Sequence, residues 1–331
     1  MRRTVLISCL GAAAIIAAVA SQVGSRPVAS DVESQPTASR AASQPPAHAG
    51  SLMWAPPELE NPITIQLERE RSAHRLRDGQ DYIVVFPKDG QKVGSTALIG
   101  GRNIVIVGGS ATVPADDKMR RALYIKDATG TVHVEGLEVT CTPDAEFDAF
   151  AISAPQATVQ LQNIRACVRG TQNGFHGDLV QPWGGVKELR VDHFTGFSGY
   201  QGFQLPAIRS RTIGQVTLAN VDLHSIDEQI ARTEPSGGNG GFLLWTIGGT
   251  NCDRTFPISM SEVYAEGRPG RSPGTIVWPS STKPSDCPTT VRDGIVSFPH
   301  QPVTGTVTLG KPAKGEFVPL GAAGVDYKPG A

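Results

Sequence analysis

Aromatic side chains, charge of one sign and metal-ligand spacings are all scarce in this chain. Phe, Trp and Tyr make up 6% of its 331 residues, beside 37 glycines and 25 prolines, a composition that favours many short strands and turns. Basic and acidic residues number 30 and 31, so the formal net charge of −1 gives no reason to expect nucleic acid or an anionic membrane as a partner. The five cysteines include no CxxC pair, which excludes the common structural zinc sites.

The longest apolar run opens the chain. Arg2 and Arg3 precede an apolar segment that starts at Val5 and ends in Ala18-Val19-Ala20, the small-x-small pattern that signal peptidase accepts. We therefore predict a secretory signal peptide over residues 1–20. An uncleaved membrane anchor is the alternative, although the sixteen residues 5–20 fall short of a comfortable span.

The next thirty residues have a different composition. Residues 21–50 are Ser, Ala, Pro and Gln with almost no large apolar side chain, so they cannot repay the entropy cost of ordering and are expected to form a disordered linker. Residues 51–331 then form a single domain. This layout predicts a secreted protein, extracellular or periplasmic, with a cell-surface tether as an open alternative and no membrane partner once the signal is removed.

Export also bears on the cysteines. Removal of Cys9 with the signal leaves an even number, and three pairings are open to them. We favour Cys141 with Cys167 and Cys252 with Cys287. Strict alternation opposes the first pair, because Cys141 is five residues after its turn and Cys167 four, so a bulge would be needed.

An internal repeat determines the expected fold. Six segments share the pattern apolar-x-apolar-x-turn-apolar, and their turn residues follow one another at intervals of 28, 27, 30, 27 and 42 residues. Gly or Asn at four of these six turns favours a left-handed backbone conformation there. The segments begin at Ile104, Val132, Val159, Leu189, Val216 and Ile258, and their turn residues are Gly108, Gly136, Asn163, His193, Asn220 and Glu262.

A unit of this size cannot bury its own apolar face, so the coils must stack into an all-β parallel β-solenoid. A shorter apolar strand precedes most segments by about nine residues, and gives each coil a first and a second strand. We expect coils over about residues 80–300, an N-terminal cap within 52–94, a closing tail from about 298, and long loop insertions at 226–241 and 268–294. An antiparallel sandwich, the alternative, would show hairpin turns and shorter spacing.

This pattern resembles the right-handed parallel β-helix of the pectate-lyase-like superfamily, with the Asn-rich turn as the best-matching feature. The resemblance implies that fold, and its range of functions includes polysaccharide lyases, glycoside hydrolases and phage tailspikes. The stretch "HGDLVQ" is similar to the "NTDGID" motif of polygalacturonase-type hydrolases, of which only the acid at Asp178 matches. The next coil has Gln201 and Gln204 where that motif's partners would carry acids, and the later Gly-His-Gly and Arg-Ile-Lys elements are missing.

Stacking also makes neighbours of residues far apart in the chain, about 4.8 Å from coil to coil. Alignment of the first strands on Leu123, Phe150, Val180 and Phe203 predicts two outward columns. The first consists of Arg121, Asp148, Asp178 and Gln201, and the second of Tyr124, Ala151, Gln181 and Gln204.

The two adjacent aspartates carry the candidate chemistry. Neighbouring carboxylates repel, so we expect a raised pKa for Asp148 or Asp178 unless a cation lies between them. Their expected separation of about 5 Å suits a retaining glycosidase. Ca²⁺, which prefers carboxylate and backbone oxygens, is the one cofactor that the pair would suit.

Lyase chemistry needs a base and a cation that neutralises a uronate carboxylate. His176 is the candidate base, with Glu146 or Asp178 to orient it, and Arg121 a candidate cation. Trp183 and Tyr200 could stack on sugar rings. The candidate substrate-binding residues are Gln181, Trp183, Lys187, Tyr200, Gln201 and Gln204.

Two functional hypotheses follow. The first is a secreted polysaccharide lyase or glycoside hydrolase that acts through His176, Asp178, Asp148 and Arg121, with a polysaccharide or glycan as partner; the clustering of these residue types in one coil favours it. The second is a non-catalytic glycan-binding or cell-surface structural solenoid, which the missing hydrolase acids favour. A hydrogen-bonded ladder explains an Asp or Gln column without any chemistry, and His193 is best explained as a turn residue.

Overall fold

The computed structural model describes residues 52–68, 72–87, 93–142, 145–169, 175–207, 211–226 and 241–329, all within one compact unit that spans Pro45–Ala331. The predicted signal peptide, the predicted linker and most of the predicted insertion at 226–241 lie outside the described residues.

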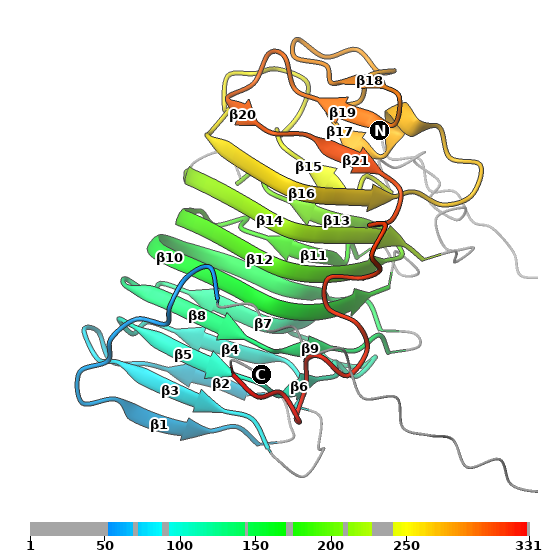
Figure 1. Ribbon diagram of the computed structural model, residues 1–331. Helices are drawn as coiled ribbons and strands as arrows, with labels where there is room; N and C mark the ends of the chain where they lie inside the picture. Colours follow the sequence, from blue (N-terminus) through cyan, green and yellow to red (C-terminus); the bar gives the residue numbers. More distant parts are fainter. Residues whose placement is uncertain are drawn as a thin grey trace, which may run out of the picture. The chain divides into compact units, whose positions relative to one another are not determined.

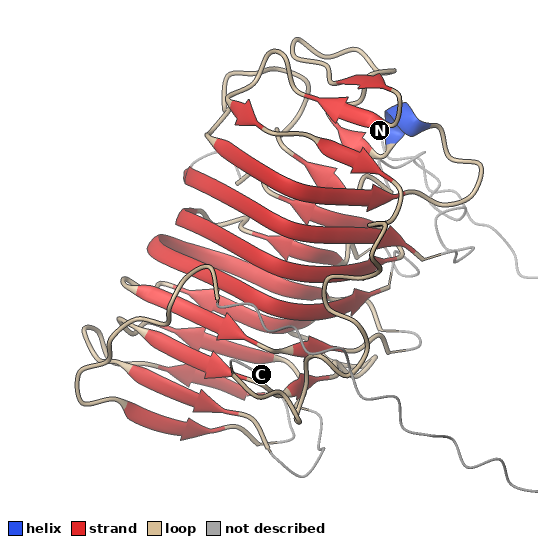
Figure 2. Ribbon diagram, viewed as in Figure 1, coloured by secondary structure: helices blue, strands red, loops and turns tan. Residues whose placement is uncertain are grey.

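Parallel strands lie one above another in chain order (Figure 1). Each coil contributes one strand to a first sheet and one to a second sheet. Figure 2 shows strands and loops through most of the described residues, and a short 3₁₀ turn lies at Pro273–Thr275. The first sheet contains β2 (Ser72–Arg75), β4 (Thr96–Ile99), β7 (Arg121–Lys126), the start of β10 (Asp148–Val168), β11 (Asp178–Gln181), β13 (Gln201–Gln204), β15 (Leu244–Trp245) and β17 (Val277–Trp278). The second contains β1 (Ile63–Gln66), β3 (Tyr82–Val85), β5 (Ile104–Val107), β8 (Thr131–Glu135), the rest of β10, β12 (Val186–Ser198), β14 (Ile213–Ser225) and β16 (Ile258–Glu266).

Shorter strands extend the second sheet. Strands β6 (Ser110–Ala111) and β9 (Glu138–Val139) pair with each other in parallel, and β20 (Val303–Thr304) and β21 (Val307–Leu309) add to β16. Strands β18 (Thr290–Arg292) and β19 (Ile295–Ser297) form an antiparallel hairpin, and β19 also pairs antiparallel with β21. The expected all-β stack of parallel coils is therefore confirmed, with an antiparallel addition at its C-terminal end.

The predicted repeat sets the register of the second sheet. Val159 pairs with Val132 on one side and with Leu189 on the other. All six predicted turn residues have a positive φ, from 52° at His193 to 69° at Gly136. His193 and Glu262 adopt this conformation although neither is Gly or Asn, because the coils above and below hold the same turn.

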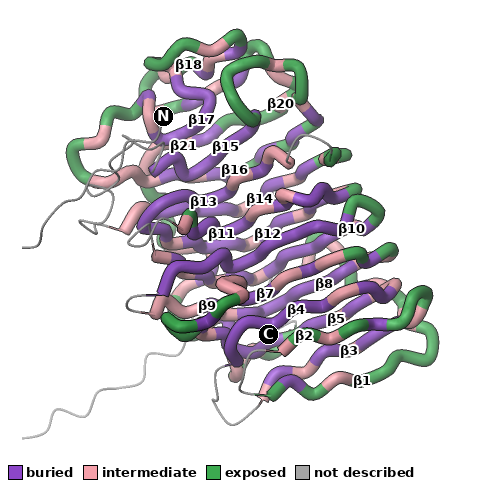
Figure 3. Tube along the Cα trace, turned by 180° about the vertical axis from the view of Figure 1, so that it is seen from behind, coloured by how far each residue is buried: buried purple, intermediate pink, exposed green. Residues whose placement is uncertain are grey.

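The core lies between the two sheets. One apolar cluster runs through the stack, and Figure 3 shows buried residues along the strands and exposed ones mainly at the turns and at β1. Phe194 connects the sheets, because its ring centroid lies 6.3 Å from that of Phe150 and 4.9 Å from that of Phe203. The inward residue of each coil thus packs on the coils beside it, which a single coil cannot achieve.

The stack begins earlier than the sequence predicted. Strands β1 and β2 pair in parallel with β3 and β4, so residues 63–99 form coils rather than a separate cap. The predicted insertion at 268–294 likewise includes β17, a further first-sheet strand that pairs with β15. These strands escaped prediction because they are short, four residues in β1 and two in β17, and carry no repeat turn.

The C-terminal tail also departs from its prediction. Strands β20 and β21 help to close the end of the stack, but the tail then turns back and runs along the outer side of the second sheet (Figure 1). Glu316 forms an ion pair with Arg165 at 2.6 Å, and the backbone N–H of Val318 donates to the Thr195 hydroxyl at 2.8 Å. Tyr327 lies against Gly136, where a β-carbon would fall 2.1 Å from its ring.

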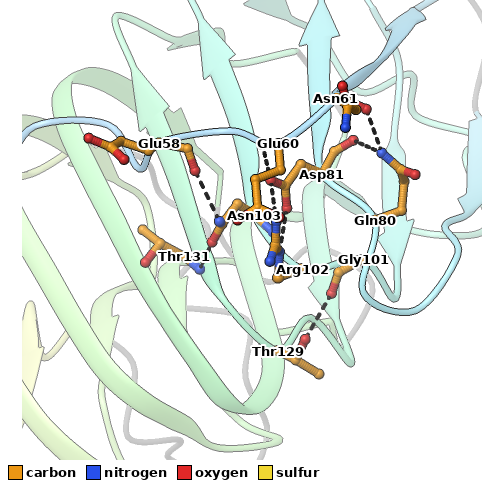
Figure 4. A network of polar contacts seen from close by, with 10 residues as sticks. All are labelled: Glu58, Glu60, Asn61, Gln80, Asp81, Gly101, Arg102, Asn103, Thr129 and Thr131. Carbon is orange, nitrogen blue, oxygen red and sulfur yellow. Dashed lines mark hydrogen bonds and ion pairs between the residues drawn. The ribbon is translucent and has the colours of Figure 1, made fainter.

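The N-terminal segment is fastened to the same sheet. Trp54 exchanges two hydrogen bonds with the Gln162 side chain, at 3.1 and 2.8 Å. Farther along, Figure 4 shows the network around Asp81, a fully buried carboxylate that accepts hydrogen bonds from Arg102 and from the backbone N–H groups of Glu60 and Asn103. The Arg102 guanidinium and these N–H donors hold the pKa of Asp81 well below its usual range, despite its burial.

Both predicted disulfides are present, Cys141–Cys167 and Cys252–Cys287. The face conflict expected for the first does not arise, because β9 ends at Val139 and Cys141 lies beyond the pleated strand. Its Cα atom is 4.8 Å from that of Cys167. The bridge therefore joins a loop to a strand in the next coil.

Candidate functional site

The two first-sheet columns have the predicted register. Asp148 pairs with Arg121, and Asp178 pairs with Gln201. The backbone N–H of Asp178 donates to Oδ1 of Asp148 at 3.2 Å, so the two aspartates are direct neighbours. Side chains thirty residues apart in the sequence thus come together because consecutive coils are stacked.

The aspartates face the outer side of the first sheet. Ala149 and Phe150 are consecutive residues, yet both belong to the apolar core, and the same holds for Leu179 and Val180. In each strand the alternation of inward and outward side chains is therefore interrupted within this pair of residues. The residue before each pair therefore lies on the opposite side from the core. The Arg121 guanidinium agrees with this placement, because it lies 5.0 Å from the Tyr124 ring and 6.0 Å from the Trp183 ring.

The pair is nevertheless not open to solvent. Asp148 is 1% exposed and Asp178 0%, and Gln201 is buried as well. The backbone beside the pair is closely packed, because a β-carbon at Gly177 would lie 2.6 Å from the backbone oxygen of Arg169. Local sequence does not show this burial, because the residues in contact belong to different coils.

Burial dominates the electrostatics of the pair. It raises the pKa of Asp148 to about 7, although the N–H of Asp178 and the charge of Arg121 oppose the rise. Burial and then the charge of Asp148 raise the pKa of Asp178 well above its usual range. Within the described residues neither carboxylate oxygen of Asp178 has a hydrogen-bond partner. The expected raised pKa is confirmed, and the pair retains a proton near neutral pH.

Arg121 is the cation that forms an ion pair with Asp148. Its Nε lies 3.7 Å from Oδ2 of Asp148, and its side chain is 28% exposed. The guanidinium also lies near the half-buried rings of Tyr124 and Trp183. It can therefore neutralise a charge on Asp148 only in part.

The second column forms the accessible part of the site. The Gln181 side chain donates its amide N–H to the Gln204 carbonyl oxygen, and both residues are half-buried. At one end of this pair the rings of Tyr124 and Trp183 are stacked, with centroids 6.2 Å apart and planes inclined by 27°. An amide pair beside an aromatic stack presents polar and apolar groups to solvent together.

His176 and Tyr200 form another ring stack near the aspartates, with centroids 4.9 Å apart. His176 is exposed, whereas Tyr200 is buried. Lys187 is exposed at the start of β12 and, as far as the structure describes the chain, has no hydrogen bond or ion pair with this group. The structure therefore places Arg121, Asp148, Asp178 and Gln201 in one column and the Gln181–Gln204 pair in the next, whereas Lys187 has no hydrogen bond or ion pair with them among the described residues.

Two features escaped the sequence reasoning. The second column continues beyond Gln204, which pairs with Trp245, and Trp245 pairs with Trp278. The outer side of the second sheet also carries buried His–acid pairs: His133 Nε2 lies 3.1 Å from Glu135, and His224 Nε2 lies 2.7 Å from Asp222. The sequence patterns His-x-Glu and Asp-x-His could have predicted these pairs, because alternate residues of a strand lie on the same face.

Within the described ranges, no group of three or more His, Cys, Asp and Glu side chains is placed to hold a metal ion, so Ca²⁺ at the aspartate pair stays a prediction. In the same part of the chain, no helix has the length and apolar character needed to cross a bilayer. No protein-family model, curated protein or solved structure matches this chain.

Proposed function

We propose that this protein is a secreted, carbohydrate-directed right-handed parallel β-helix, related in fold to the pectate-lyase-like superfamily, that binds a glycan along the outer face of its first sheet. The hand is supported by a general rule, since crossovers between parallel strands of one sheet are right-handed in about 98% of cases. Secretion is supported by the N-terminal signal pattern and by two disulfides, which persist in oxidising compartments.

The observation that carries the proposal is the accessible Gln181–Gln204 amide pair beside the Tyr124–Trp183 stack. Sugars offer hydroxyl groups that exchange hydrogen bonds with amides and C–H faces that pack on aromatic rings. Successive coils repeat such groups at the strand spacing, so a linear polymer can contact several coils at once. A glycan chain is the ligand that this regular, extended surface suits best.

The test is binding of the purified chain to a panel of uronate and neutral polysaccharides, by affinity electrophoresis or calorimetry. We expect Trp183→Ala and Gln181→Ala to weaken binding to the preferred polymer by about tenfold or more, the effect of a lost ring or hydrogen-bond contact. Gln215→Ala, at an exposed glutamine of the second sheet, is the matched control and should bind as the unaltered chain does. Absence of binding to every polymer would contradict the proposal.

A second candidate, polysaccharide lyase or hydrolase activity, is favoured by the raised pKa values of Asp148 and Asp178. A carboxyl group with a pKa near 7 is suited to general acid or base catalysis. Its burial means that the structure around it would have to open before a substrate touched it.

The activity test uses the same panel and follows the absorbance of unsaturated products and the release of reducing ends. If this candidate is right, Asp178→Asn and His176→Ala both lose activity while they still bind the polymer. Binding without product on any polymer would leave the non-catalytic function.

A further inference from the structure

A hollow of about 730 Å³ opens at the edge of the stack, where two successive coils pass from the first sheet to the second. One wall is the segment that follows β13, and the other is the segment that follows β15. It lies apart from the residues that carry the proposed glycan face. The residues that matter to its chemistry are Arg211, Ile213, Gly249, Asp253, Arg254 and Phe256.

The hollow carries two guanidinium groups that have no partner among the described residues. Arg211 and Arg254 are both exposed, and neither forms a hydrogen bond or an ion pair with any residue that the structure describes. The lining carboxylate, Asp253, instead accepts a hydrogen bond from the Asn251 side chain at 3.0 Å. The charged lining residues thus leave a formal excess of one positive charge and two free forks of N–H donors.

The wall that carries Arg254 is held in place from several directions. Cys252 is joined to Cys287 by a disulfide, and the N–H of Asp286 donates to the Thr250 oxygen at 2.9 Å. The indole N–H of Trp278 donates to the Gly249 oxygen at 2.9 Å. A binding wall fixed in advance loses less conformational entropy when a ligand arrives.

The opposite wall is tied to the coil before it. The N–H of Val186 donates to the oxygen of Thr212 at 3.1 Å, directly after Arg211. Ile213 pairs with Val186 in the second sheet. Phe256, which is 7% exposed, and the half-buried Ile213 add apolar surface to the lining.

From these features we infer that the hollow is a binding pocket for an oxyanion, a carboxylate, sulfate or phosphate group, borne by a ligand with a small apolar body. The planar guanidinium fork matches oxyanions in geometry and charge, and the apolar lining suits the rest of such a ligand. This inference does not rest on glycan binding, because Arg211 and Arg254 take no part in the proposed glycan face.

The experiment is calorimetric titration of the full chain, at low ionic strength, with three separate probes: inorganic sulfate, inorganic phosphate and benzoate. We expect at least one probe to bind, and Arg211→Gln and Arg254→Gln each to weaken it by about tenfold, as loss of one charge-assisted contact does. Arg292→Gln removes an equally exposed arginine elsewhere and should bind as the unaltered chain does. The probe that binds most tightly identifies the class of anion.

The disulfide offers an independent readout. Cys252→Ser with Cys287→Ser frees the wall that bears Arg254, and we expect a several-fold weaker affinity. If that double variant does not fold, the two arginine variants test the inference alone, because both arginines are exposed. The inference is overturned if no probe binds, or if Arg211→Gln and Arg254→Gln bind as tightly as Arg292→Gln.

Discussion

Asp81 and Asp178 are both fully buried, yet their surroundings shift the pKa of the carboxyl group in opposite directions. Asp81 accepts hydrogen bonds from Arg102 and from two backbone N–H groups, and its pKa is lowered. Asp178 has no partner for either carboxylate oxygen among the described residues, and burial raises its pKa. Burial alone therefore does not determine the charge of a side chain in this stack; the supply of donors does.

The source of those donors explains the difference. Around Asp81 they come from the entering N-terminal segment and from the turn at Arg102, outside the strand ladder (Figure 4). Asp178 lies within a first-sheet column whose backbone N–H groups are engaged by the neighbouring coils. The charge of the neighbouring Asp148 carboxyl group adds to the effect of burial and raises the pKa of Asp178 further.

The largest expected effect is at Asp81. Asp81→Ala leaves the N–H groups of Glu60 and Asn103 without their acceptor, and we expect a loss of about 2–3 kcal/mol in the free energy of unfolding at pH 7. Because the folded pKa is lowered, the stabilisation is present above about pH 4, the unfolded value, and declines below it. Urea unfolding at pH 7 and pH 3 measures both. Asp78→Ala, at an exposed aspartate three residues away, is the control and should change little.

The opposite sign is expected at Asp178. A raised folded pKa means that the folded state holds a proton that the unfolded state has lost, so stability falls as pH rises from about 4 through 7. Asp178→Asn removes that cost, and we expect it to be more stable than the unaltered chain by about 1–2 kcal/mol at pH 8 and nearly equal at pH 4. Thermal or urea unfolding across this range tests it, with Asp116→Asn, at an exposed residue, as control. Loss of stability at pH 8 would show that the ionised pair has a partner, such as a bound cation.

Glu135 resembles Asp81 in having hydrogen-bond donors, and removal of one donor would make its surroundings more like those of Asp178. Burial acts to raise the pKa of Glu135, but hydrogen bonds from His133 and Tyr327 outweigh it and leave the pKa lowered. Tyr327→Phe removes one of these donors, so we expect a loss of about 1–2 kcal/mol and a higher pKa for Glu135. Calorimetric unfolding as a function of pH reports both. In the control, Tyr264→Phe, the lost hydroxyl bonds only an exposed Glu262, and stability should stay unchanged.

The smallest expected effect is at Arg121, the ion-pair partner of Asp148. Arg121→Gln removes a partly exposed charge 3.7 Å from Asp148, so we expect a loss below about 1 kcal/mol, greater at pH 8 than at pH 5 because only the ionised carboxylate is attracted. Arg292→Gln, whose ion pair with Asp293 is almost fully exposed, should show no pH-dependent loss. Equal effects of the two substitutions would show that Arg121 does not act on the pair.

Particular residues show how far prediction from sequence reached. Asn163 and Asn220 marked the repeat turn, and from it the strand register and the vertical pairing of Asp148 with Arg121 could be predicted, whereas alternation counted from the same turns opposed the Cys141–Cys167 bridge that the structure contains. Trp278 could not be placed on the second column, because β17 is two residues long and lies in what reads as a loop insertion. The return of the tail to Gly136 had no signal either, since Tyr327 follows a stretch without strand pattern.

The sequence by itself determined the stacking of the coils and which side chains become vertical neighbours, because a short alternating repeat can bury its apolar face only against a copy of itself. Only the tertiary structure decided whether each of these side chains is exposed to water, hydrogen-bonded to a donor, or buried without a partner. The donors around Asp81 and the disulfide that holds the wall beside Arg254 come from segments distant in the chain, and no local pattern records where such segments pass.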